Sequence, residues 1–103
     1  MIDKSKIIDT VCERLTKLPT GHYLDLRTYK RNRSVIIVKM GEDDLLVIEK
    51  GYFEDRFRLR LDKLEKLLKT LLRREFPRSR KIRLYAMGDF SEVDASNAKR
   101  KIL

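Results

Sequence analysis

The segment from Tyr52 to Leu61 alternates between charged and apolar residues from Arg56 onward. Its apolar positions are Phe57, Leu59 and Leu61, and its basic positions are Arg56, Arg58 and Arg60. A period of two indicates a half-buried β-strand, because successive side chains point to opposite faces of a sheet. We therefore expect one face of this strand in a hydrophobic core, and a row of arginines together with Tyr52 on the other face.

Two segments have the hydrophobic period of an α-helix. From Asp3 to Leu18 one apolar stripe comprises Ile7, Ile8, Val11, Cys12, Leu15 and Leu18, and the sequence Pro19-Thr20-Gly21 ends the pattern. Leucines at spacings of three and four follow Asp62 as far as Phe76, and Pro77 stops that helix. Asp62 and Glu65 have the spacing of a capping box, which predicts the start of the second helix.

Four more segments are predicted strands, namely residues 22–29, 34–40, 45–50 and 80–87. The second and third of these are apolar on both parities, which is typical of central strands. Short turns join the strands up to Leu61 in chain order, so they form an antiparallel meander. The predicted fold class is α+β: an antiparallel four- to five-stranded sheet with helices packed on one face, in the order α-β-β-β-β-α-β.

Chain length and periodicity together predict the domain organisation. The 103 residues suffice for one domain, and we expect it to span residues 1–87. After Gly88 the hydrophobic periodicity is lost. We expect residues 88–103 to be a C-terminal tail that is mobile or is ordered by a partner.

The charge composition points to an anionic partner. There are 25 Lys and Arg residues against 16 Asp and Glu, a formal net charge of +9, which favours nucleic acid or an anionic surface as the partner. Many charges with no Gln and two Asn indicate a thermophilic, archaeal source. The single Cys12 cannot form an internal disulfide, and the chain has neither a membrane-length apolar run nor a signal-peptide pattern. We expect a cytoplasmic protein.

The residues on the predicted outer face of the sheet, with the basic turn 30–33, form the candidate nucleic-acid site. They are Tyr23, Arg27, Tyr29, Arg31, Arg33, Tyr52, Arg56, Arg58, Arg60, Lys81, Arg83 and Tyr85. All four tyrosines of the chain are in this set. Bases stack on aromatic rings while cations contact phosphates, so the pattern favours single-stranded over duplex nucleic acid. The alternative is a solvated basic face whose tyrosines cover neighbouring apolar surface.

Catalytic and metal chemistry have little support in the sequence. His22 is the only histidine, so a Cys/His metal cluster is not expected. The four glycines are isolated and do not form a phosphate-binding loop. We expect neither an enzyme nor a bound cofactor.

The element order and the stretch Glu75-Phe76-Pro77-Arg78-Ser79-Arg80-Lys81-Ile82-Arg83-Leu84-Tyr85 resemble the ThermoDBP-related family of archaeal single-stranded DNA-binding proteins. The resemblance covers residues 3–87. It implies an apolar and aromatic surface with basic walls, DNA binding without sequence preference, and a homodimer. The family dimerises through a C-terminal helical zipper, but this chain has no heptads after Gly88. More loosely, the meander followed by a helix is similar to the PUR and Whirly group.

The sequence leaves the function open among three hypotheses. The first is a sequence-tolerant single-stranded DNA-binding protein that acts in replication or repair. The second is an RNA-binding protein, because nothing in the residues separates DNA from RNA. The third is a non-enzymatic interaction subunit whose basic sheet docks on an acidic partner.

Overall fold

The computed structural model describes residues 2–27, 33–51, 54–77 and 80–89. The elements, in chain order, are β1 (Ile2–Asp3), α1 (Lys4–Lys17), β2 (His22–Arg27), β3 (Ser34–Lys39), β4 (Asp44–Lys50), β5 (Glu54–Arg60), α2 (Leu61–Glu75) and β6 (Lys81–Asp89).

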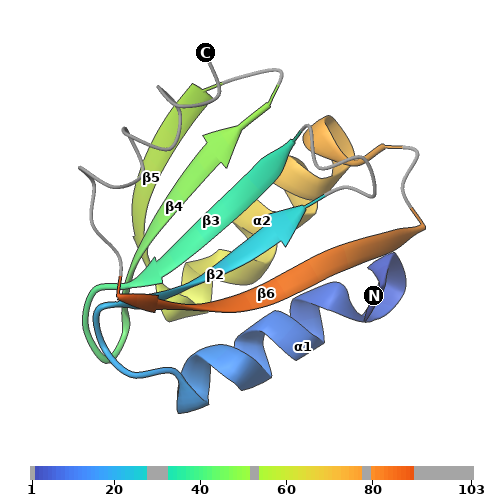
Figure 1. Cartoon of the computed structure of the whole chain (residues 1–103). Coiled ribbons are helices and arrows are strands. Elements are labelled where there is room, and N and C mark those ends of the chain that lie inside the picture. The colour runs from blue at the N-terminus through green and yellow to red at the C-terminus, as the bar shows by residue number, and fades with distance from the viewer. Residues whose placement is uncertain (1, 28–32, 52–53, 78–79, 90–103) are drawn as a thin grey trace.

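Within the described residues the strands form one six-stranded antiparallel sheet, in the order β1-β6-β2-β3-β4-β5. The predicted meander is confirmed as β2 to β5, and Figure 1 shows these four strands side by side with β6 next to β2. The strand that follows α2 therefore returns to the opposite end of the meander. This return places β6, the last strand of the described residues, beside β2.

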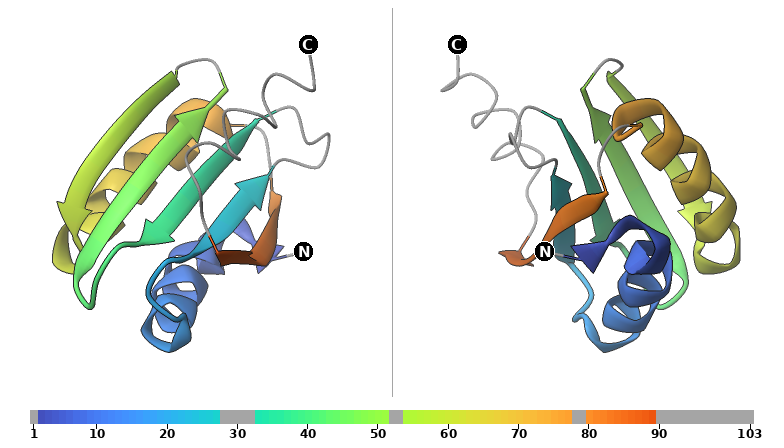
Figure 2. Two further views of the ribbon diagram at one scale, coloured as in Figure 1. Left: turned by 60° about the vertical axis from the view of Figure 1, so that its left-hand side comes forward. Right: turned by 90° about the vertical axis from the view of Figure 1, so that its right-hand side faces the viewer.

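Both helices of the described chain pack on the same face of the sheet, as the right-hand view in Figure 2 shows. The α+β fold class is confirmed. The core between the two layers contains Ile7, Val11, Leu15, Leu24, Leu26, Val35, Ile37, Leu45, Val47, Leu64, Leu68, Leu71, Phe76 and Ile82. Each such aliphatic or aromatic side chain stabilises the fold by about 1.5–3 kcal/mol on burial. Neither described helix is long and apolar enough to cross a membrane.

The start of α2 differs from the prediction. The helix begins at Leu61, its N-cap is Arg60, and no side chain caps it, so the predicted capping box of Asp62 and Glu65 is wrong. Instead, the backbone N–H of Leu61 donates to the carbonyl of Asp43, at 2.9 Å. A tertiary contact with the β3–β4 turn thus satisfies one of the free backbone donors at the start of the helix.

The ends of the sheet also extend beyond the prediction. β1, which pairs with Lys81 and Ile82 at the start of β6, is too short to leave a periodic signal. β6 continues through Gly88 and Asp89, two residues that we expected in the tail. The remaining predicted tail (90–103) and the end of the predicted first strand (28–29) lie outside the described residues.

A buried polar cluster fixes the C-terminal end of α2 to the sheet. Glu49 on β4 and Glu75 at the end of α2 are both 0% exposed. Arg74 donates two hydrogen bonds to the Glu49 carboxylate, one of them Nε to Oε2 at 2.9 Å. Arg33 donates to the Glu75 carbonyl oxygen at 3.0 Å, and any side chain at Gly51 would overlap the Glu75 carboxyl.

Burial and the neighbouring Glu75 carboxyl both act on the protonation of Glu49. Burial raises the pKa of Glu49; the hydrogen bond from Arg74 opposes the rise, and a hydrogen bond with the Glu75 carboxyl adds to it. Two carboxyl groups can hydrogen-bond to each other only if one of them carries a proton. Because the folded-state pKa is raised, this group contributes stability below the unfolded pKa, and the contribution is lost as pH rises through the folded pKa.

We predict that Glu75→Gln reduces this loss of stability, because it removes the contribution of the second carboxyl and leaves the burial of Glu49 unchanged. The glutamine amide donates to Glu49 at every pH, so the hydrogen bond no longer needs a proton. Thermal melts from about pH 4.5 upward should show the wild-type melting temperature falling relative to that of the variant. Glu42→Gln, which neutralises an exposed turn residue, is the matched control and should follow the wild type. Parallel pH profiles for the wild type and Glu75→Gln would contradict a contribution of the Glu75 carboxyl to the pKa of Glu49.

Candidate nucleic-acid interface

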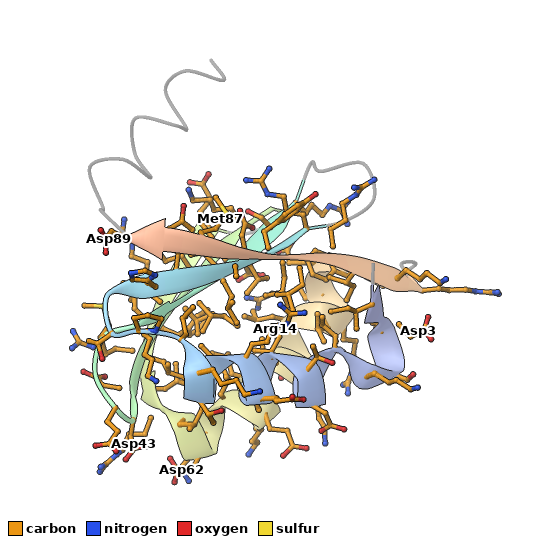
Figure 3. All side chains as sticks on the ribbon, turned by 60° about the horizontal axis from the view of Figure 1, so that its bottom comes forward. Asp3, Arg14, Asp43, Asp62, Met87 and Asp89 are labelled. Atoms are coloured by element: carbon orange, nitrogen blue, oxygen red, sulfur yellow. The ribbon has the colours of Figure 1, made fainter. Side chains whose placement is uncertain are left out.

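The outer face is the side of the sheet that points away from α1 and α2. The strand register assigns to it Tyr23, Asp25 and Arg27 on β2; Ser34, Ile36 and Val38 on β3; Asp44, Leu46, Ile48 and Lys50 on β4; Glu54, Arg56, Arg58 and Arg60 on β5; and Lys81, Arg83, Tyr85 and Met87 on β6. In Figure 3, Met87 lies on the side of β6 away from α1. The basic and aromatic residues that the sequence pattern placed together therefore lie on one face of the sheet.

An apolar centre lies in the middle of this face, on the central strands β3 and β4. It consists of Ile36, Val38 and Ile48, with exposed fractions of 6%, 1% and 4%, against which Tyr23 and Leu46 pack. Both strands are therefore apolar on their two faces, as the sequence predicted. The register places Arg56 beside Ile48 and Arg58 beside Leu46, so arginine stems flank this centre.

Arg56, Arg58 and Arg60 form an arginine row along β5, an edge strand of the described sheet. All three are exposed. Alternate residues on one strand are about 7 Å apart, so the row presents three cations in an extended line. An extended single strand can match that line with successive phosphates.

Asp44 is the first residue of β4, although the sequence pattern placed it in the turn before that strand. Its carboxylate forms an ion pair with Arg58. The Arg58 guanidinium donates to both carboxylate oxygens, with Nη2 to Oδ2 at 2.6 Å and Nε to Oδ1 at 3.2 Å. These hydrogen bonds lower the pKa of Asp44. Asp44 therefore partly neutralises Arg58, the middle member of the arginine row. The strand register that brings the two residues together is a non-local feature, which the alternation along β5 does not reveal.

A tyrosine–arginine cluster lies across the apolar centre from the arginine row, on β2 and β6. It consists of Tyr23, Arg27, Arg83 and Tyr85. The Arg27 guanidinium lies over the Tyr85 ring, 5.8 Å from its centroid, and Arg83 Nη1 is 3.5 Å from the Tyr85 hydroxyl. Tyr23 is a diagonal neighbour of Tyr85, within reach of a second ring. Rings and guanidinium groups are thus interleaved on one patch.

The carboxylate of Asp25 holds Arg27 in this position. Arg27 Nε and Nη2 lie 2.9 and 2.8 Å from Asp25 Oδ2. This hydrogen bond raises the pKa of Arg27, so the guanidinium stays charged. Alternation with Tyr23 and Arg27 is consistent with Asp25 on the outer face. Its pairing with Arg27 depends on side-chain rotamers and leaves no signal in the sequence.

The remaining predicted site residues have different positions. Arg33 immediately precedes β3, and its side chain donates a hydrogen bond to the end of α2. Lys81 is exposed at the start of β6, opposite Asp3 of β1. Tyr29, Arg31 and Tyr52 lie outside the described residues. The structure therefore brings Arg56, Arg58 and Arg60 onto one face with Tyr23, Arg27, Arg83 and Tyr85.

Two other features lie on the helix side. A cavity of about 320 Å³ between α1 and α2 is lined by Lys4, Ile8, Lys69, Leu72, Arg73 and Pro77. Burial raises the pKa of the Cys12 thiol, as expected for a packed residue of α1. Within the described ranges, no group of three or more His, Cys, Asp or Glu side chains is arranged to hold a metal ion.

Comparison of the chain with protein-family models, with curated proteins and with solved structures gave no match.

We predict that Arg58→Ala raises the pKa of Asp44 toward its ordinary value and leaves the melting temperature nearly unchanged. Arg58 is exposed and the pair lies at the surface, so the substitution removes a charge interaction without opening the core. NMR titration of the Asp44 carboxyl carbon measures the shift. Arg73→Ala, at an exposed position of α2, is the control and should leave the pKa of Asp44 unchanged. A variant that unfolds would show that the strand faces are assigned incorrectly.

Proposed function

We propose that the protein binds single-stranded DNA on the outer face of the sheet, without requiring a particular sequence. One observation carries the proposal: the arginine row and the tyrosine–arginine cluster flank an apolar centre on the face that the described helices leave uncovered. Cations along a backbone path combined with rings for base stacking are the two parts that sequence-tolerant single-strand binding requires.

The separation of the two basic regions suggests how a strand lies. β5 and β2 are three inter-strand spacings apart, about 14 Å. Phosphates follow the arginine row along β5, and bases extend over the apolar centre toward Tyr23 and Tyr85. Stacking is worth about 1–3 kcal/mol per base, and it needs an exposed base face, which a duplex does not offer.

RNA is the alternative ligand from the same class, since stacking and phosphate contacts do not depend on the sugar. An acidic protein partner is the alternative from another class, because it would satisfy the same cations. An acidic partner bound by charge alone does not need the tyrosine rings, whereas a single strand uses both the rings and the cations. Competition with an uncharged-backbone oligonucleotide separates the two classes, because only a stacking surface retains affinity for it.

The cellular setting is part of the proposal. A single-stranded DNA-binding protein acts in the cytoplasm of a prokaryote on strands exposed in replication or repair. The resemblance to the ThermoDBP-related family agrees with this setting, and the homodimer that it implies stays a prediction. β5 ends the described sheet with a row of like charges, which opposes edge-to-edge pairing of two copies through this strand.

We predict that Tyr85→Ala weakens single-strand binding by about 1–3 kcal/mol and leaves duplex binding unchanged, because only single strands stack on the ring. Tyr85→Phe keeps the ring and should keep most of the affinity. Fluorescence anisotropy with DNA single strands, RNA single strands and DNA duplex of equal length measures both effects, and the wild type should prefer single strands by about tenfold.

Thermal melts of both Tyr85 variants provide the control for folding. Equal affinity of the wild-type protein for single strand and duplex would contradict the stacking role. So would an alanine variant that loses stability but binds as tightly as the wild type.

A further inference from the structure

Asp25 is an unusual residue for a basic interface. It lies on the outer face and is only 2% exposed. Both interactions with Arg27, from Nε and from Nη2, use one carboxylate oxygen, Oδ2. The other oxygen, Oδ1, is buried and has no hydrogen-bond partner among the residues that the structure describes.

Positioning Arg27 does not account for the second oxygen. A buried carboxylate oxygen without a hydrogen bond costs stability, because it has lost its water and gained no donor in return. Buried polar atoms of this kind are uncommon, and each calls for an explanation such as an ordered water, an ion or a functional role. Oδ1 is therefore an acceptor that a donor from a ligand can satisfy.

We propose that Asp25 selects guanine among the bases that stack on this part of the sheet. The inference rests on the proposed function, since it requires a single strand on the outer face. Tyr85 lies directly opposite Asp25 across the β2–β6 pair, so a base stacked at Tyr85 has its edge near the carboxylate. The site adds a modest preference to binding that is otherwise tolerant of sequence.

The chemistry of the four bases favours guanine at a carboxylate. Guanine has two adjacent donors on its Watson–Crick edge, N1–H and the N2 amino group. In adenine and cytosine a ring nitrogen lone pair adjoins the amino group, and in thymine two carbonyls flank N3–H. Guanine is therefore the only one of the four bases on which a carboxylate finds two adjacent donors and faces no lone pair. The guanine O6 acceptor then lies on the same edge, where the neighbouring guanidinium of Arg27 or Arg83 can donate to it.

A base reaches Oδ1 only when a neighbouring side chain moves, because the atom lies beneath the surface. Arg27, bonded to the same carboxylate, has a side chain that is 39% exposed.

The test compares three short oligonucleotides by fluorescence anisotropy on the wild-type protein. The first is oligothymidylate, the second has guanine at every third position, and the third has hypoxanthine at those positions. Hypoxanthine lacks only the N2 amino group, and the spacing avoids guanine quadruplexes. We expect the guanine strand to bind at least about fivefold tighter than the other two.

Asp25→Asn tests the residue itself by the sign of its effects. It places an amide in a buried site of the same shape, so a donor replaces an acceptor. We expect weaker binding of the guanine strand, while oligothymidylate binding stays equal or tightens because the protein gains one positive charge. Asp44→Asn adds the same charge on the same face and frees Arg58. This control should tighten the binding of both strands.

The outcomes separate this inference from the proposed function. Equal affinity for guanine, hypoxanthine and thymine strands overturns the inference and leaves the proposed function standing. Absence of binding to all three overturns both. Parallel changes for both strands in Asp25→Asn would show that Asp25 acts through charge or stability alone. If that variant does not fold, the guanine–hypoxanthine comparison on the wild-type protein decides the question.

Discussion

Burial of one sheet face under both helices is the constraint on which the molecule depends. The apolar stripes of α1 and α2 cover the residues of a single parity on each strand, from Leu24 on β2 to Ile82 on β6. A strand cannot slip by one residue without exchanging its two faces. The core therefore fixes which side chains lie outside, and it aligns Arg56 and Arg58 on one edge strand with Arg27 and Tyr85 across the sheet.

Two carboxylates that differ in burial bind arginines on the outer face and so modify its charge. Asp44 lies at the surface and neutralises part of the arginine row through Arg58. Asp25 is buried and orients Arg27 against Tyr85. An acidic side chain beside a basic one lowers the net positive charge that a phosphate meets. Neither Asp25 nor Asp44 is therefore expected on a surface whose only property is high positive charge. Both restrict guanidinium groups to defined directions, which favours ordered contacts over diffuse attraction.

The sequence predicted the elements that have a strong period. The leucines of α2, the alternation of β5 and the two-sided apolar character of β3 and β4 each identified an element and its faces. Leu61 shows the limit, because it continues the alternation of β5 and also begins the stripe of α2. In the structure it begins the helix, and its backbone N–H donates to the carbonyl of Asp43, a contact that is remote in the sequence.

The site was predicted less completely than the fold. Periodicity placed Arg27, Arg58, Arg83 and Tyr85 on one face, but gave no information on pairing between strands. Arg33 looked like part of a basic turn and instead bonds to the end of α2. Glu49 and Glu75 have charged side chains that sequence patterns assign to solvent, yet both are buried in a shared cluster. Such pairings arise from tertiary structure alone.

The most direct measurement of the outer face as the binding surface is an NMR titration. Amide and side-chain shifts of the isotope-labelled protein would be followed while oligothymidylate is added. We expect the changes to concentrate on Tyr23, Arg27, Leu46, Arg56, Arg58 and Tyr85, with α1 and the exposed side of α2 unaffected. Changes confined to the helices, or centred on the cavity between Lys4 and Arg73, would contradict the assignment of the outer face as the nucleic-acid interface.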